Sequence, residues 1–135
     1  MRAAKPFLDS NVVLYLLSGD AHKADRAEAL LRDTAIVSVQ VLNEVTSVAR
    51  RKLALAWDEV DELLAAVKSH CTVIDLTVAT HEEGLRHARM LGLSLYDAMI
   101  VSSALLAGCS ILYSEDMHHG LVIDKQLKIV NPFRR

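Results

Sequence analysis

The sequence contains few aromatic residues and few cysteines. Aromatic residues make up only 4% of the 135 residues, so the core must be built largely from aliphatic side chains and alanine. The two cysteines, Cys71 and Cys109, form no C-x-x-C pair, which argues against a zinc site or a thiol–disulfide motif. We expect both to be reduced thiols buried in the core.

Long apolar runs and a leader segment are also missing. No uninterrupted apolar run approaches the about 20 residues needed to span a membrane. Phe7 and Leu8 lead straight into Asp9, so the N-terminal residues do not have the pattern of a cleavable signal peptide. These absences predict a cytoplasmic protein that does not associate with membranes.

The chain has no excess of positive charge. Its formal net charge is −2, whereas proteins that bind nucleic acid regardless of sequence are usually basic. Any contact with phosphate must therefore come from a local patch or from a bound metal ion. The chain does have 52% apolar and 24% charged residues, which is typical of a folded protein, and we expect residues 1–135 to form a single domain.

Strand-like and helix-like patterns alternate along the sequence. Five segments have the pattern of buried strands: Lys5–Leu8, Ala35–Val39, Thr72–Leu76, Ser110–Tyr113 and Leu127–Val130. Helical periodicity fills the segments between them: Asn11–Leu17, His22–Arg32, from Gln40 onward, after Asp58, after Thr80, and Leu95–Ala107. Asp58 and Ser94 are expected N-caps, and Thr80–Glu83 has the pattern of a capping box. The alternation predicts an α/β fold with a parallel sheet covered by helices on both faces.

Four acidic residues fall at positions that such a fold brings to one edge. Asp9 and Asp116 come just after predicted strands, and Glu44 lies one turn into the helix that follows another strand. Asp97 opens a helix whose start returns to the same edge if the helix runs antiparallel to the strand that follows it. Because sites in parallel sheets lie at the carboxyl ends of the strands, we expect the four carboxylates to meet at one rim.

A cluster of carboxylates is costly unless a cation joins it, because like charges repel. Oxygen ligands of this kind suit Mg²⁺ or Mn²⁺. Asp97 stands beside an apolar helix, where an unpaired carboxylate is unfavourable, so a cation is expected near it. Asp9 is the strongest candidate ligand, since Ser10 or Asn11 could cap the following helix and leave Asp9 free for metal.

Other polar residues lie near these acids in the sequence. Arg51 follows Glu44 by two turns on the same helix face, about 10 Å along the axis. It is either a contact for an RNA phosphate or a plain surface arginine. Tyr96, next to Asp97, is expected to pack against the protein rather than to take part in chemistry. The adjacent His118 and His119 receive no role, and solvent exposure is expected for them.

Four short motifs, in order and in register, resemble the PIN domain. They are D-S-N-V at Asp9–Val12, N-E at Asn43–Glu44, G-L-S-L-Y-D-A at Gly92–Ala98, and Y-S-E-D at Tyr113–Asp116. Over almost the whole chain, the sequence is more narrowly similar to VapC-type toxins of bacterial toxin–antitoxin pairs. The resemblance implies a PIN-like three-layer α/β sandwich with a five-stranded parallel sheet. It also implies a Mg²⁺- or Mn²⁺-dependent ribonuclease, a homodimer, and a cognate antitoxin that blocks the site.

The resemblance also assigns roles to individual residues. It makes catalytic and metal-binding residues of the four acids: Asp9, Glu44, Asp97 and Asp116. Ser114 matches the polar helper after the last strand, and Asn11 matches the asparagine that supports the first aspartate. Glu115 competes with Asp116 for the fourth position, and the family pattern favours Asp116. The leading hypothesis is therefore a metal-dependent endoribonuclease that hydrolyses RNA phosphodiester bonds as the toxin of such a pair.

Two other functions remain open at the level of sequence. A receiver-like phosphoacceptor domain shares the length, the fold class and an aspartate at a strand end. Asp75 could be its acceptor, but Asp9 has no acidic neighbour beside it and a Lys-Pro near the last strand is missing. The second alternative is a PIN fold kept only as an interaction module. The intact acidic quartet argues against that reading, because an unused cluster is an electrostatic cost.

Overall fold

The centre of the protein is a six-stranded sheet in which five strands are parallel. The computed structural model describes residues 5–134. The parallel strands are β1 (Phe7–Leu8), β2 (Ala35–Ser38), β3 (Cys71–Ile74), β4 (Ile111–Tyr113) and β6 (Leu127–Val130). A short β5 (Val122–Ile123) runs antiparallel to β6. The strand order is β3-β2-β1-β4-β6-β5, so the predicted parallel sheet of five strands is confirmed and one edge strand is added to it.

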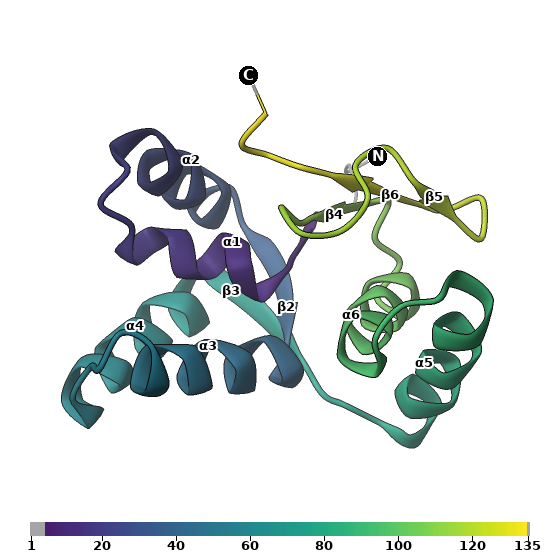
Figure 1. Cartoon of the computed structure of the whole chain (residues 1–135), viewed down its shortest axis with the longest axis horizontal. Coiled ribbons are helices and arrows are strands. Elements are labelled where there is room, and N and C mark those ends of the chain that lie inside the picture. The colour runs from purple at the N-terminus through teal and green to yellow at the C-terminus, as the bar shows by residue number, and fades with distance from the viewer. Residues whose placement is uncertain (1–4, 135) are drawn as a thin grey trace.

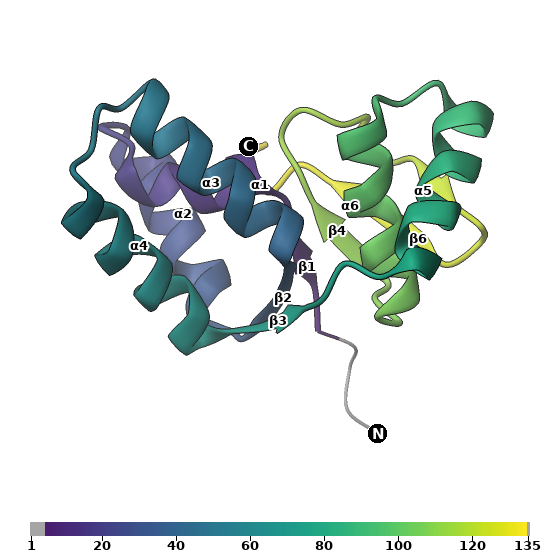
Figure 2. The same cartoon turned by 90° about the horizontal axis from the view of Figure 1, so that it is seen from below.

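Six helices flank this sheet. They are α1 (Ser10–Leu14), which continues as the 3₁₀ turn η1 (Tyr15–Leu17), α2 (Ala21–Arg32), α3 (Val39–Arg51), α4 (Trp57–His70), α5 (Val78–Leu91) and α6 (Leu95–Leu106). Helices α1 to α4 gather beside β1–β3, whereas α5 and α6 form a pair beside β4 and β6 (Figure 1). The turned view in Figure 2 shows the same two groups. The alternation of strands and helices read from the sequence is therefore observed.

The core is aliphatic, as the composition predicts. Phe7 and Leu8 of β1 are wholly buried, and the middle strands add further aliphatic side chains such as Val37, Leu112 and Ile129. Helix α6 is buried on nearly all sides because its sequence is apolar all round. The cysteines Cys71 and Cys109 are free and buried, as expected.

Two predicted helix starts are wrong. Helix α5 begins before Thr80, because Thr77 is its N-cap and the two threonines cap each other's backbone N–H groups at 3.1 and 3.2 Å. Helix α4 begins before Asp58: Ala56 is the N-cap residue, and Glu59 accepts a hydrogen bond from its backbone N–H at 2.9 Å. Ser94 does cap α6, as predicted, by accepting from the N–H of Asp97.

The sequence analysis missed the β5–β6 hairpin. Two of its three turn residues, Asp124 and Lys125, have positive φ (52° and 57°), as the central residues of a type I′ turn do. Asp-Lys lacks the glycine that usually marks such turns, so the sequence signal is weak. The turn is held by side chains instead, since Asp124 accepts from Arg86 at 2.7 Å and lies 3.1 Å from His87 Nε2.

No single helix among residues 5–134 is long and apolar enough to cross a membrane. The pair α5–α6 has the required length and composition only when its two helices are counted together, and it bends by 117° at the break between them.

Close packing between α5 and α6 depends on Gly84. A Cβ added at this position would lie 2.6 Å from the Sδ atom of Met99, well inside van der Waals contact. A larger side chain at this position would therefore have to displace the side chain of Met99.

We predict that Gly84→Val lowers the free energy of unfolding by about 1–3 kcal/mol, because the added side chain overpacks this contact. In a Met99→Ala background the same substitution should cost at least about 1 kcal/mol less, since the clashing atom is gone. Urea denaturation of the four proteins of this double-mutant cycle measures the difference. An equal penalty in both backgrounds would show that Met99 is not the obstacle.

Candidate active site

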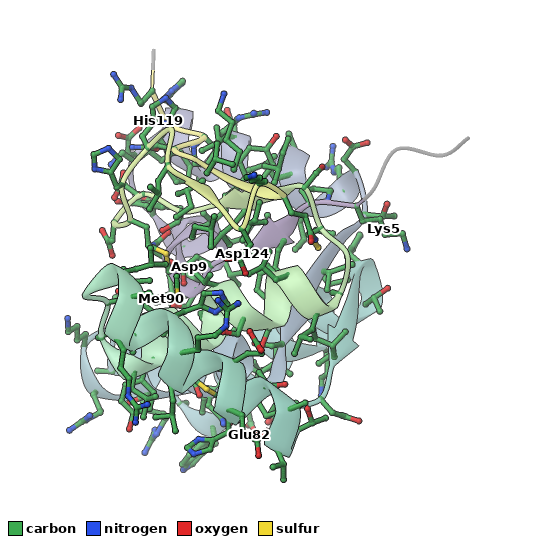
Figure 3. All side chains as sticks on the ribbon, turned by 90° about the vertical axis from the view of Figure 1, so that its right-hand side faces the viewer. Lys5, Asp9, Glu82, Met90, His119 and Asp124 are labelled. Carbon is green, nitrogen blue, oxygen red and sulfur yellow. The ribbon has the colours of Figure 1, made fainter. Side chains whose placement is uncertain are left out.

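Asp9 lies where the chain changes direction across the sheet. The chain passes from β1 to β2 and β3 on one side and then returns to β4 and β6 on the other, so the switch lies between β1 and β4. Open parallel sheets bind ligands at such a point. The backbone N–H of Asp9 donates to the carbonyl of Tyr113 at 3.0 Å, and this bond joins the carboxyl ends of β1 and β4. Its side chain is only 3% exposed and lies toward the middle of the molecule (Figure 3).

The two oxygens of the Asp9 carboxylate accept hydrogen bonds from different parts of the chain. Oδ1 accepts from the backbone N–H of Ser10 at 2.7 Å, so Asp9 itself is the N-cap of α1. The expectation that Ser10 or Asn11 would take over this task is therefore wrong. Oδ2 accepts from the hydroxyl of Ser114 at 2.8 Å. The carboxylate thus joins the start of α1 to the segment after β4.

Asn11 connects Asp9 with Asp116. Its Nδ2 amide donates to Oδ2 of Asp9 at 3.3 Å and to Oδ2 of Asp116 at 3.1 Å. Its Oδ1 accepts from the backbone N–H of Glu115 at 3.2 Å. The bonds to Asp116 and Glu115 tie the first turn of α1 to the segment after β4, so the two aspartates are brought together although they are 107 positions apart in sequence.

Glu44 is connected to Asp9 through Ser10. The Ser10 hydroxyl lies 3.2 Å from Oε1 of Glu44 and 3.4 Å from Oδ1 of Asp9. Glu44 is half-buried one turn into α3, at the flank of the helix's buried stripe rather than opposite it. Asp97 makes no hydrogen bond to the other three side chains, but it lies close enough to interact electrostatically with each of them.

Three of the four carboxylates, those of Asp9, Glu44 and Asp97, have raised pKa values. The pKa of Asp9 is raised to about 6, chiefly by burial and also by the negative charges of Asp97 and Glu44, against the hydrogen bonds from Ser114 and Ser10. The pKa of Glu44 is raised by burial and by Asp97, and that of Asp97 by burial and by Asp116. Among residues 5–134, no lysine, arginine or histidine forms an ion pair with any of the four acids.

The donor chemistry fits a hard divalent cation. Four carboxylates, the Ser114 hydroxyl and the Asn11 amide offer only oxygen ligands, which suit Mg²⁺ or Mn²⁺. In the described part of the chain, however, no three histidine, cysteine, aspartate or glutamate side chains lie close enough together to enclose an ion as they stand. Ser10 and Asn11 stand between pairs of carboxylates. Ligation by three or more acids therefore requires some of these side chains to rotate.

The neighbouring Glu115 is engaged elsewhere. It forms an ion pair with Lys23 at 2.8 Å and a short hydrogen bond with the hydroxyl of Tyr15. Its pKa is lowered by the Lys23 and Tyr15 hydrogen bonds, which outweigh its desolvation. This pairing removes Glu115 from competition with Asp116. His119 also has a definite partner, because its Nδ1 accepts from the backbone N–H of Asn131 at 2.9 Å and anchors the loop after β4.

A serine, a histidine and an aspartate line up in a second place, between α5, α6 and the β5–β6 hairpin. Nδ1 of His87 lies 2.8 Å from the Ser102 hydroxyl, and Nε2 lies 3.1 Å from Asp124. Ser102 is completely buried and donates to the carbonyl of Ala98 at 2.7 Å, so no substrate reaches it. The arrangement therefore joins secondary-structure elements and is not a hydrolytic triad. Sequence spacing alone gave no sign of it.

One face of α3 forms a polar pocket next to the acids. The pocket has a volume of about 410 Å³ and is lined by Gln40, Asn43, Glu44, Ser47, Arg51 and Tyr96. Arg51 therefore shares a surface with Glu44, as predicted. Tyr96 does not pack against the protein as expected, because 61% of it is exposed. Helix α6 buries residues from Ala98 onward, whereas its first two residues are exposed.

Comparison with known proteins shows the family of the chain. The family model of the PIN domain matches residues 7–120. The chain belongs to the PIN domain family. No curated protein sequence matches it significantly.

Solved structures with the same fold include several toxin–antitoxin proteins. A toxin–antitoxin complex from Klebsiella pneumoniae has a TM-score of 0.73 at 20% identity, over 95% of this chain and 98% of that one. The DNA-bound VapBC of Salmonella typhimurium has a TM-score of 0.66 at 21% identity, over 93% and 96%. VapC20 of Mycobacterium tuberculosis, described as a toxin that cleaves the sarcin-ricin loop, has a TM-score of 0.65 at 20% identity, over 83% and 90%. At these identities the likeness establishes the PIN fold alone.

The topology contradicts the receiver-like alternative. A flavodoxin-like receiver has the strand order 2-1-3-4-5, whereas here β1 lies between β2 and β4, and β3 is at the edge. Asp75, the candidate acceptor, follows that edge strand and is two strands away from Asp9. The two residues therefore belong to different parts of the rim.

The raised pKa of Asp9 predicts how the metal-free protein responds to pH. Its folded-state pKa of about 6 lies above the ordinary value of 3.8, so the folded protein holds the proton more tightly than the unfolded chain. The resulting stabilisation, roughly 3 kcal/mol, is fully present below pH 3.8 and is lost as the pH rises through about 6. Asp9→Asn should remove this part of the profile. Urea denaturation of both proteins in EDTA between pH about 4 and about 7 measures it, and parallel profiles would contradict the assignment.

Proposed function

We propose that this PIN domain is a metal-dependent endoribonuclease that hydrolyses RNA phosphodiester bonds. The observation that carries the proposal is that Glu44, Asp97 and Asp116 lie near the buried carboxylate of Asp9. None of the four acids has a cationic partner among residues 5–134. Such a cluster lowers stability unless it serves a bound cation. Membership of the PIN family supports the same reading. The alternative of a pure interaction module gives no reason for keeping four acids at one rim.

The four acids would hold one or two Mg²⁺ or Mn²⁺ ions. When bound, a divalent ion supplies charge relief on the phosphate and an activated water for hydrolysis. Asp9 would be the central ligand, oriented by the hydroxyl of Ser114 and the amide of Asn11. Hydrogen bonds of this kind fix a ligand's direction and tune its basicity. The half-buried Glu44 and Asp97 would contribute further oxygen ligands, and so would the exposed Asp116.

We also propose that the protein is the toxin of a toxin–antitoxin pair and acts in the cytoplasm as a homodimer. The proposal draws on the structural neighbours, which are described as toxin–antitoxin complexes. A pocket of about 330 Å³ beside Asn11 and Asp116 supports an inhibitory partner. It is lined on its other sides by apolar residues of α1, η1 and α3, so a partner segment with an apolar anchor could dock next to the acids.

Purified protein should cleave single-stranded RNA in Mg²⁺ or Mn²⁺ and stop when EDTA is added. Asp9→Asn and Asp97→Asn should each lower the cleavage rate at least about 100-fold, because loss of a ligand removes several kcal/mol of charge stabilisation in the transition state. The rate is measured on labelled RNA under single-turnover conditions, with circular dichroism to show that the variants fold.

Asp75→Asn is the matched control, because Asp75 is an exposed aspartate at a strand end outside the cluster. Its rate should equal that of the unmodified protein. Cleavage that persists in EDTA, or an Asp97→Asn variant with full activity, would contradict the proposed site.

Expression of the chain alone should arrest bacterial growth, and co-expression of the small protein encoded beside its gene should relieve the arrest. Asp9→Asn should remove the arrest at an equal protein level. Growth curves and immunoblots measure both effects, and sedimentation of the purified toxin should give the mass of a dimer. Normal growth at a high level of folded, RNA-cleaving protein would argue against the toxin role but leave the nuclease proposal intact.

A further inference from the structure

Tyr96 is a largely exposed ring beside the acid cluster. It directly precedes Asp97 at the start of α6, and 61% of it is exposed. Trp57, the other strongly exposed aromatic residue among residues 5–134, is covered on one face by the guanidinium of Arg50 at 4.3 Å. Within the same range, Tyr96 has no aromatic or cation–π neighbour. Much of its ring surface is therefore accessible to a planar ligand.

The pocket that Tyr96 borders has the chemistry of a nucleotide site. Gln40, Asn43 and Ser47 line it along one face of α3. Their amides and hydroxyl both donate and accept hydrogen bonds, as the edge of a base requires. Glu44 belongs both to this pocket and to the acid cluster, so the pocket opens directly onto the proposed site of cleavage. Arg51, at the far end, is the one cationic residue that lines it.

The charge of the protein makes stacking the more important source of affinity. The net charge is −2, and the site itself contains four carboxylates, so a general basic groove cannot provide the binding energy. Stacking of a base on an aromatic ring does not depend on net charge and accepts any base. It requires a base whose faces are free, which single strands and loops offer but A-form helices do not.

We propose that this pocket is a subsite for one unpaired nucleotide of single-stranded RNA, with its base stacked on Tyr96 and its backbone phosphate contacted by Arg51. The inference rests on the proposed ribonuclease function and specifies where one nucleotide of its substrate binds. It makes Tyr96 a binding residue, next to but separate from the four acids.

The test uses short single-stranded RNAs in which 2-aminopurine replaces one base at successive positions. Binding is measured in Mg²⁺ with the Asp116→Asn protein, so that the RNA stays intact. When 2-aminopurine occupies the position that enters the subsite, its fluorescence should be quenched on binding, because the base stacks on Tyr96. Tyr96→Ala should lose this quenching and bind roughly 5- to 150-fold more weakly. Tyr96→Phe, which keeps the ring, should retain the quenching.

Two further variants separate stacking from charge. Arg51→Ala should reduce the slope of log affinity against log salt by about 0.7, as expected for one phosphate contact to a single strand. The loss in Tyr96→Ala should be the same at low and high salt. Trp57→Ala is the matched control, since it removes an equally exposed ring outside the pocket, and it should leave the quenching unchanged.

Unchanged affinity and quenching in Tyr96→Ala would overturn the subsite. A second result would also overturn the subsite. If Tyr96→Ala sediments with a lower mass than the parent protein, and loses the quenching only at concentrations where it dissociates, Tyr96 belongs to a contact between two copies of the chain. The failure of the nuclease proposal looks different, because the unmodified protein would then cleave no RNA in Mg²⁺. RNA that binds with Tyr96-dependent quenching but is not cleaved would keep the subsite and remove the nuclease.

Discussion

The structure depends on a buried carboxylate that holds together two ends of the chain. Asp9 caps α1 with one oxygen and accepts from Ser114, after β4, with the other. The backbone N–H of the same residue closes β1 onto β4. Burial raises its pKa to about 6, so the fold keeps this charge at a cost. The cost is concentrated at the switch point of the sheet, where a bound cation would remove it.

The same interaction explains why other residues are where they are. Asn11 occupies the first turn of α1, so its amide reaches both Asp9 and Asp116. Glu115 turns away from the cluster toward Lys23 and Tyr15, which ties α2 and η1 to the segment after β4. Three kinds of interaction thus involve the segment after β4: the backbone hydrogen bond of Asp9, the amide hydrogen bonds of Asn11 and the ion pair of Glu115. The two parts of the sheet are fixed relative to each other by this junction.

Much of this could be predicted from the sequence, because the fold follows from alternating patterns and each acid follows a strand or opens a helix. Glu44 and Arg51 were placed on one face by helical spacing, and the polar pocket contains both. Other features left weak local signals. The start of α5 depends on a pair of threonines that cap each other, and the β5–β6 turn depends on Arg86 and His87, which are distant in sequence. The exposure of Tyr96 depends on where α6 leaves the core, which a local pattern does not encode.

The order of the elements along the chain also affects when the acid cluster can assemble. Asp9 precedes its Ser114 partner by 105 positions and its neighbour Asp116 by 107. A nascent chain that has not yet been extended past β4 therefore lacks both. The complete cluster forms only after the segment that follows β4 has been made and has folded onto β1.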